Sequence, residues 1–219
     1  PGGIAIVNCD SEFSQSWLDK LPKEKIKRLS STQKLDVWAE DIQLDDQAHA
    51  SFYICTASER VKVKLALPGR HNVMNALIAT ALTSEFGVSL KNAAHALANM
   101  GEVKGRVNII KVSDKLTVID DTYNANVQSV KAAIDLLSDI EGQRILAFGD
   151  MGELGEQARM YHQQVGEYAK QKGIDELYTL GVLSKYASDE FEKPNRHFSS
   201  RDQLLQQLET QLSEKSEKT

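Results

Sequence analysis

The feature that most constrains the fold is a regular alternation of strand-like and helix-like segments from about residue 103 onward. Short apolar runs alternate with longer segments whose apolar side chains recur every three or four positions, as on one face of a helix. This pattern is typical of an α/β domain with a mostly parallel sheet, because each helix returns the chain to the edge where the next strand begins. We expect strands at residues 106–112, 116–122, 144–150, 176–181 and 196–199, and helices at residues 127–139, 156–172, 183–191 and 201–213.

The preceding residues contain mainly strand-like segments, and we expect strands at residues 3–8, 36–44, 51–57 and 61–67. In the last of these, apolar and mostly charged residues alternate, which is the period of a strand with one buried face. Two helices follow, one capped by Asn72 and one by Ser89. We expect two domains, residues 1–102 and 103–219, with a hinge in the glycine-flanked segment GEVKG, residues 101–105.

Composition narrows the class of protein. Hydrophobic residues make up 41% of the chain and charged residues 26%, as in ordinary globular proteins. The net charge of −5 and the lack of a basic cluster argue against nucleic acid or a membrane surface as partner. Two cysteines, no apolar run of membrane-spanning length and no signal peptide favour the cytoplasm, and we expect a monomer. The absence of an initial Met suggests a piece of a longer protein.

The sequence VIDDTYNAN, residues 118–126, carries two adjacent carboxylates from an apolar strand into a turn rich in amides. In open α/β sheets, ligands bind beyond the carboxyl ends of the strands. The glycine-rich segment GDMGELG, residues 149–155, follows the next strand, so the two strand ends together predict one wall of a polar crevice. A structural interpretation is the alternative: Asn126 caps the following helix, and Asp120 and Asp121 are simply solvated.

Four segments, in this order and at these separations, resemble the Mur ligase family: PGRHNVMNALIATAL, VKGRV, VIDDTYNANVQSVKAAI and FGDMGELG. The segments DDTYNAN and GDMGELG are most similar to the branch that joins D-alanyl-D-alanine to UDP-N-acetylmuramoyl-tripeptide, whereas HNVMNA is shared across the family. The resemblance extends from the N-terminal strands to about residue 200. It implies the later part of a central ATP-binding domain, followed by a Rossmann-like C-terminal ligase domain.

What the resemblance implies is an ATP- and Mg²⁺-dependent ligase of peptidoglycan precursor synthesis. The tripeptide carboxylate is phosphorylated to an acyl phosphate, which the amine of D-alanyl-D-alanine then attacks. No GxxxxGK[ST] loop occurs in the chain, so the residues that cradle the ATP phosphates and help to bind Mg²⁺ are not among these 219 residues. The family's nucleotide-sugar domain and its terminal KGS segment are also missing from it. We therefore expect the chain to be inactive by itself.

The resemblance also implies roles for single residues. Asn72 and Asn75 match the family's amides on the adenine side of ATP, where an amide can both donate and accept. Arg106 matches an arginine that reaches the phosphates, and Asp121 matches an aspartate near the ribose. The side of the site that receives D-alanyl-D-alanine is implied to include Tyr123, Asn124, Asn126, Asp150 and Glu153. After NAN, where the family usually has Pro and an acid, this chain has Val and Gln.

Structural alternatives stay open for several of these residues. Asn72 could be only a helix cap, Asn75 a surface amide, and Arg106 a solvated residue that opens a strand. Asp120 is expected to stabilise its turn through backbone N–H groups, and His162 to have a packing role. Two other functions also stay open: a Mur-type or folylpolyglutamate-type ligase for a different amino acid, and a non-catalytic nucleotide-binding module. The DDTYNAN turn argues against the first of these.

Overall fold

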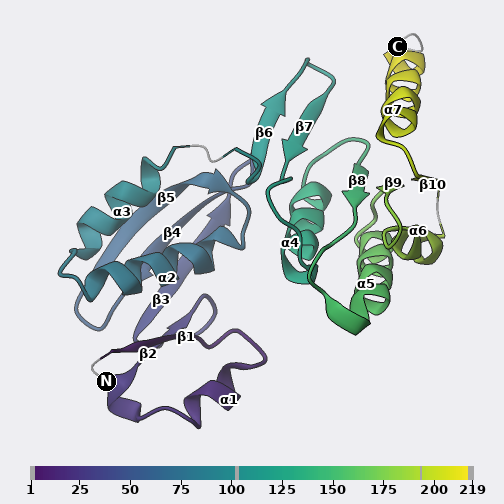
Figure 1. Ribbon diagram of the computed structural model, residues 1–219. Coiled ribbons are helices and arrows are strands. Elements are labelled where there is room, and N and C mark those ends of the chain that lie inside the picture. The colour runs from purple at the N-terminus through teal and green to yellow at the C-terminus, as the bar shows by residue number, and fades with distance from the viewer. Residues whose placement is uncertain (1–2, 102–103, 193, 217–219) are drawn as a thin grey trace. The chain divides into compact units, whose positions relative to one another are not determined.

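The computed structural model describes residues 3–101, 104–192 and 194–216 (Figure 1). The chain divides into two compact units, residues 1–108 and residues 109–219. Each unit has its own hydrophobic core. Among the described residues, no helix combines the length and the apolar character needed to cross a membrane.

The α/β class predicted from the sequence is confirmed, because one unit is built on a mixed sheet with helices and the other on a parallel sheet with helices. The predicted domain boundary and hinge depend on Glu102 and Val103, which lie outside the described residues. Both therefore stay predictions.

A five-stranded sheet forms the first unit, in the order β1-β2-β3-β4-β5. The strands β1, β2 and β3 pair in parallel, whereas β3, β4 and β5 are antiparallel neighbours. The alternation predicted for β5 is confirmed over its central part: Val63 and Leu65 are buried, and Lys62 and Lys64 are exposed. The strands span Ala5–Asn8 (β1), Ile26–Ser30 (β2), Val37–Leu44 (β3), His49–Cys55 (β4) and Arg60–Pro68 (β5).

Two helices, α2 (Asn72–Ser84) and α3 (Leu90–Ala98), pack beside this sheet (Figure 1). Their buried side chains, such as Leu77 of α2 and Ala94 of α3, join Phe52 of the sheet in one core. Because α2 begins directly after β5, its first turn lies at the end of that strand. The sheet and the helix therefore position the residues between them.

Of the two predicted helix caps in this unit, one is confirmed and one is wrong. Ser89 does cap α3, accepting from the N–H of Asn92 over 3.2 Å. Asn72 does not cap α2: it is the first residue of the helix, and His71 occupies the cap position without a side-chain cap bond. Oδ1 of Asn72 accepts from Nδ2 of Asn75 instead of from a backbone N–H. Three elements are absent from the sequence prediction, one of them the 3₁₀ helix η1 (Lys23–Lys25). The strand β2 mixes charged and apolar residues, and the short helix α1 (Ser14–Leu18) buries none of its side chains.

In the second unit the predicted alternation of strands and helices is confirmed. The strands β8, β9 and β10 form a parallel sheet in the order β10-β9-β8. The strands β6 and β7 instead form a separate two-stranded sheet, because the tight turn between them folds the chain back on itself (Figure 1). The elements are β6 (Asn108–Lys111), β7 (Thr117–Asp120), α4 (Val127–Ser138), β8 (Ile145–Gly149), η2 (Gly155–Gln157), α5 (Ala158–Gln171), β9 (Glu176–Leu180), α6 (Lys185–Phe191), β10 (Asn195–Phe198) and α7 (Arg201–Ser216).

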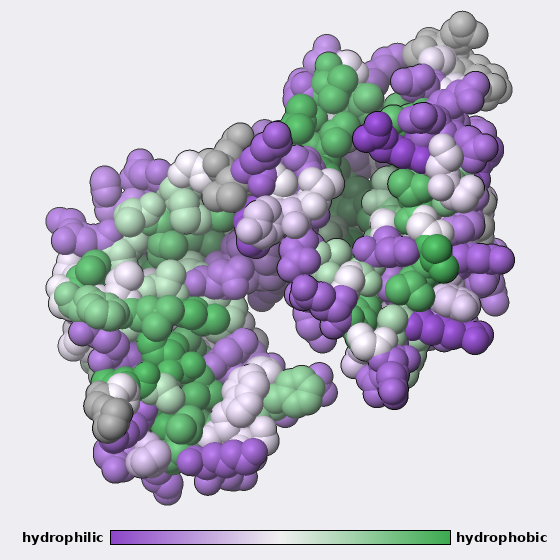
Figure 2. All heavy atoms as spheres, in the orientation of Figure 1, coloured by the Kyte–Doolittle hydropathy of each residue, from purple (hydrophilic) through white to green (hydrophobic). Residues whose placement is uncertain are grey.

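The β6–β7 hairpin differs from the parallel sheet in its surface. Ile110, Val112 and Val118 are 47%, 58% and 41% exposed. Figure 2 shows apolar side chains over this hairpin, on a face where much of the remaining surface is polar. A two-stranded ribbon has too little neighbouring structure to bury both of its faces.

The core of the second unit depends on a close approach of α5 and α6. Val165, Ile174, Leu177 and Phe191 are fully buried there. A Cβ atom on Gly166 would clash with the carbonyl oxygen of Ala187 in α6. Only glycine therefore allows the two helices to pack at this distance.

Candidate functional site

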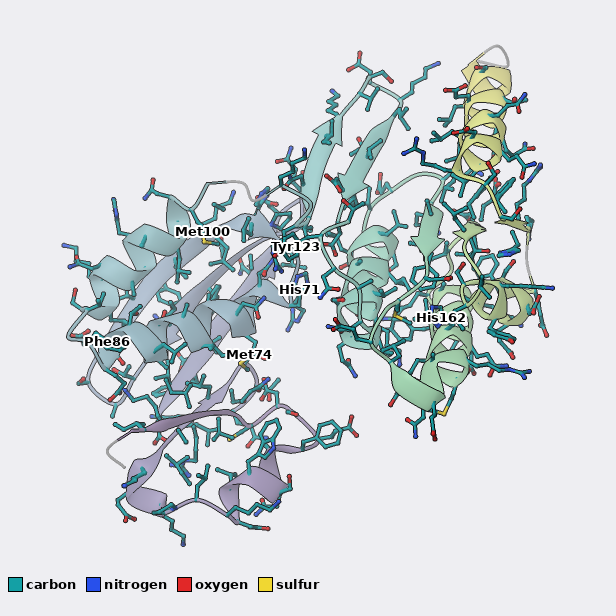
Figure 3. The ribbon with its side chains drawn as sticks, viewed as in Figure 1. His71, Met74, Phe86, Met100, Tyr123 and His162 are labelled. Carbon is teal, nitrogen blue, oxygen red and sulfur yellow. The ribbon has the colours of Figure 1, made fainter. Side chains whose placement is uncertain are left out.

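The first turn of α2, shortly after β5, contains the two amides that the sequence indicates. Asn72 is 8% exposed, and its Nδ2 donates to the carbonyl oxygen of Pro68 over 2.7 Å. Asn75, which is exposed, donates from Nδ2 to Oδ1 of Asn72 over 2.9 Å. Gly69 turns the chain with a φ of +101°, and the ring of His71 occupies the space that a side chain at position 69 would need. Figure 3 shows His71 at this end of α2.

This amide pair retains hydrogen-bonding capacity. A side-chain amide has two N–H donors and a carbonyl oxygen with two lone pairs. One donor of Asn72 is used on the backbone, and one donor of Asn75 is used on Asn72. Within the described residues, the side-chain oxygen Oδ1 of Asn75 accepts no hydrogen bond. The pair can therefore present a donor and an acceptor to a ligand whose edge carries both.

Arg106 is exposed in the turn that leads into β6. Its neighbours Gly105 and Val107 both have positive φ, +72° and +54°, and both are buried. For a β-branched residue such as Val107 this is an unfavourable conformation, retained only where the surroundings require it. The turn is thus closely defined around an arginine whose guanidinium can bind phosphate oxygens in pairs. The phosphate role itself stays a prediction.

The turn after β7 contains the paired carboxylates. Oδ1 of Asp120 accepts from the N–H of Thr122 over 3.3 Å and from its hydroxyl over 2.6 Å. This confirms the prediction that Asp120 stabilises the turn. Asp121 is half-buried directly beside it. The ribose role of Asp121 stays a prediction.

The amide-rich part of this turn leads into α4. Oδ1 of Asn126 accepts from the N–H of Ser129 over 2.9 Å, and the Ser129 hydroxyl accepts from the N–H of Asn126 over 3.0 Å. This reciprocal capping box confirms that Asn126 caps α4. Asn124 accepts from the N–H of Ala125 over 2.9 Å. Tyr123, labelled in Figure 3, is 67% exposed. Their role toward a substrate stays a prediction.

Asp150, at the end of β8, organises the neighbouring loop. Its carboxylate accepts from the N–H groups of Val182, Leu183 and Ser184 over 2.8, 3.0 and 2.7 Å. Burial raises the pKa of Asp150, but these three donors outweigh it and keep the pKa below its ordinary value. Asp150 therefore fixes the segment between β9 and α6, and a contact with a substrate ammonium stays a prediction.

The rest of the GDMGELG loop is anchored by a buried histidine. His162 is fully buried, and its Nε2 accepts from the N–H of Met151 over 2.9 Å. Its Nδ1 lies 2.7 Å from the carbonyl oxygen of Ala158, which indicates the tautomer with hydrogen on Nδ1. The packing role predicted for His162 is confirmed. Glu153 is exposed in the same loop with a φ of +60°.

One polar cluster was not predicted. Asp10, just after β1, accepts from the N–H and hydroxyl of Ser31, each over 2.7 Å, and from the hydroxyls of Ser30 and Thr32. Burial raises the pKa of Asp10, but these bonds outweigh it and leave the pKa below its ordinary value. Only part of the signal was available: the polar run NCD ends the predicted first strand, whereas the run SST ends β2, which the sequence does not predict.

The structure thus brings the predicted residues together in small groups. Asn72 and Asn75 are in direct contact, and Asp120 to Asn126 form one turn. Hydrogen bonding within the described residues does not pair β7 with β8, so the predicted crevice between their ends stays a prediction. The described residues contain no group of three or more His, Cys, Asp or Glu side chains that could bind a metal ion.

Comparison with known proteins accounts for both units. The family model of the Mur ligase middle domain matches residues 1–83, and that of the Mur ligase, glutamate ligase domain, matches residues 105–216. The chain therefore belongs to the Mur ligase family.

Particular relatives are similar over nearly all of the chain. The UDP-N-acetylmuramoyl-tripeptide–D-alanyl-D-alanine ligase of Escherichia coli (strain K12) is 36% identical over 213 residues, which is 97% of this chain and 47% of that protein. A crystal structure of MurF from Acinetobacter baumannii superposes with a TM-score of 0.86 at 30% identity, covering 97% of this chain and 46% of the other. MurF from Thermotoga maritima, solved in complex with ADP, has a TM-score of 0.74 at 19% identity over 94% of this chain and 47% of its own, and shows a common fold. The chain spans about half the length of the curated relatives it matches.

Proposed function

We propose that this chain is part of an ATP-dependent ligase that joins D-alanyl-D-alanine to UDP-N-acetylmuramoyl-tripeptide. The observation that carries the proposal is the similarity to the Escherichia coli ligase of that name over 97% of the chain. The geometry is compatible with it, because three of the four segments that resemble the family form hydrogen-bonded turns at the end of a strand or the start of a helix. A UDP-linked substrate and ATP imply a cytoplasmic enzyme, and we propose that it acts as a monomer.

In this proposal, Asn72 and Asn75 present their amides to the adenine of ATP. Arg106 binds the phosphates through its guanidinium, and Asp121 accepts hydrogen bonds from the ribose hydroxyls. Each side chain is complementary to its part of the nucleotide. The amides match the donors and acceptors of the adenine edge, the guanidinium donates to phosphate oxygens, and the carboxylate accepts from hydroxyl groups. D-alanyl-D-alanine is received by residues of the two following turns: Tyr123, Asn124, Asn126, Asp150 and Glu153.

The proposed reaction joins two anionic partners. The tripeptide carboxylate attacks the terminal phosphate of ATP, giving an acyl phosphate and ADP. The dipeptide amine then attacks the acyl carbon, and the C–O bond to phosphate breaks with release of inorganic phosphate. Cationic groups such as Arg106 are needed to offset the repulsion between carboxylate and phosphate, and Mg²⁺ supplies the same compensation when bound. We assign no Mg²⁺ ligand to the described residues.

A segment exchange tests the proposal. The aligned segment of the Escherichia coli ligase is replaced by this chain, and phosphate release is measured with tripeptide nucleotide, Mg-ATP and different amines. We expect phosphate release to require D-alanyl-D-alanine, while single amino acids give only background. The unmodified ligase is the control for activity, and thermal unfolding is the control for folding. A folded chimera that ligates a single amino acid in preference to the dipeptide would overturn the assignment.

A further inference from the structure

Two turns whose backbone has positive φ values lie close together at the end of β5. Ala48, in the turn between β3 and β4, has a φ of +60° and is 5% exposed. Gly69, just after β5, has a φ of +101°. Near both, the pairing of β4 with β5 shifts register between His49 and Ser51. Conformations of this kind persist where the surrounding structure requires them, and they gather near functional sites.

A chain of hydrogen bonds connects these two turns with the amide pair. The N–H of Gly69 donates to the carbonyl oxygen of Ala48 over 2.8 Å. The carbonyl oxygen of Gly69 accepts from the N–H of Asn72 over 3.0 Å. The side chain of Asn72 then accepts from Nδ2 of Asn75 over 2.9 Å. These bonds connect the Ala48 carbonyl group with the Asn75 amide through Gly69 and Asn72.

Asp45 determines the conformation of the Ala48 turn. Its Oδ1 accepts from the N–H groups of Gln47 and His49 over 3.0 and 2.9 Å, and its carbonyl oxygen accepts from the N–H of Ala48 over 2.8 Å. Its other carboxylate oxygen, Oδ2, lies 2.7 Å from Nζ of Lys64. The Lys64 ammonium, with the two backbone donors, holds the pKa of Asp45 well below its ordinary value. The backbone contacts and the Lys64 ion pair therefore use different oxygens, and Nδ1 of His49 also lies 3.4 Å from Oδ1.

We propose that Asp45 is a positioning residue for nucleotide binding. By closing the turn between β3 and β4, it directs the Ala48 carbonyl toward Gly69 and so fixes the amide of Asn75. This inference rests on the proposed function, in which Asn75 faces the adenine. Asp45 acts through the acceptor geometry of Oδ1, and its ion pair with Lys64 is dispensable.

Two substitutions separate acceptor geometry from charge. Asp45→Asn removes the charge but keeps an oxygen that can accept from both backbone N–H groups, since asparagine forms the same type of turn. Asp45→Glu keeps the charge and the reach to Lys64, but displaces the acceptor by one methylene group. Asp46→Asn and Asp46→Glu, at the neighbouring exposed carboxylate, are the matched controls.

The first measurement uses the 219-residue chain and nitrogen-15 NMR. We expect Asp45→Glu to speed hydrogen exchange of the Gly69 amide by about fivefold or more, and to shift the side-chain amide signals of Asn75. Asp45→Asn and both Asp46 variants should resemble the parent chain. If Asp45→Glu leaves both signals unchanged, or if Asp45→Asn disturbs them equally, the positioning role is wrong.

The second measurement is steady-state kinetics in the chimeric Escherichia coli ligase that carries this chain. Loss of a well-oriented hydrogen bond corresponds to about a threefold to tenfold change in affinity. We therefore expect Asp45→Glu to raise KM for ATP by that factor and to leave kcat within about twofold. An unchanged KM alongside altered NMR signals would refute the link to the nucleotide. If the parent enzyme does not ligate, the proposed function fails, and the NMR result still decides whether Asp45 positions Asn75.

Discussion

Replacing Asp150 by alanine would remove the acceptor shared by three backbone N–H groups, those of Val182, Leu183 and Ser184. Ser184 is fully buried, so water cannot reach its freed N–H, and a lost bond to a charged group there costs about 1.5–3 kcal/mol. Val182 is 80% exposed, so its N–H recovers most of its energy from water. We therefore expect Asp150→Ala to lower the free energy of unfolding of the second unit by about 2–4 kcal/mol.

The two units can be followed separately in the same experiment. Both tryptophans, Trp17 and Trp38, belong to the first unit, so their fluorescence reports urea unfolding of that unit only. Far-UV circular dichroism reports both units. We expect the fluorescence transition to stay at the same urea concentration in the Asp150→Ala variant, while a part of the dichroism transition moves to lower urea.

The contribution of Asp150 to the free energy of unfolding should depend on pH, because only its ionised carboxylate accepts from all three N–H groups. The pKa of Asp150 in the folded chain is below its value of about 3.9 in an unfolded chain. Its contribution to stability is therefore complete above that unfolded value and is lost as the pH falls toward the folded value. The difference in free energy of unfolding between the parent chain and Asp150→Asn should accordingly become smaller below about pH 4. A difference below about 1 kcal/mol at pH 7 for Asp150→Ala, or one that grows as the pH falls, would refute this reasoning.

In a ligation-competent enzyme, Asp121→Asn should weaken ATP binding or turnover roughly tenfold, whereas Asp120→Asn should chiefly lower the melting temperature; the reverse pattern in ATP kinetics and thermal unfolding would exchange their roles. His162→Leu leaves a buried backbone N–H without its acceptor and should destabilise the second unit by about 1–3 kcal/mol in urea unfolding; an unchanged transition contradicts this. Gly166→Ala places a methyl group against the carbonyl of Ala187 and should cost about 1–3 kcal/mol or more; unaltered stability would mean that α5 and α6 separate easily.

Much of the fold follows from local patterns. The strand β9 and the helix α4 begin at the residues that the sequence predicts and end one residue before the predicted ends, because apolar periodicity there is strong and the ends carry Gly and Asn signals. The strand β2, with the sequence IKRLS, has no such periodicity and is formed by pairing with its neighbours. The separation of β6 and β7 from the parallel sheet is likewise a matter of pairing, which the sequence of a strand does not encode by itself.

The candidate site divides in the same way. Asn126 could be predicted as a cap, because its partner Ser129 lies three residues along the chain. The use of Asn72 on the Pro68 carbonyl could not, because it depends on how Gly69 turns the backbone. Contacts of longer range were beyond prediction altogether: the donors to Asp150 lie more than thirty residues away in sequence.

The most direct test of the central claim is a crystal structure, with ADP bound, of a ligation-competent enzyme that contains this chain. The account predicts that the adenine edge lies within hydrogen-bonding distance of the Asn75 side chain, and that a ribose hydroxyl donates to Asp121. ADP bound with its base away from Asn75 and its ribose away from Asp121 would contradict the account.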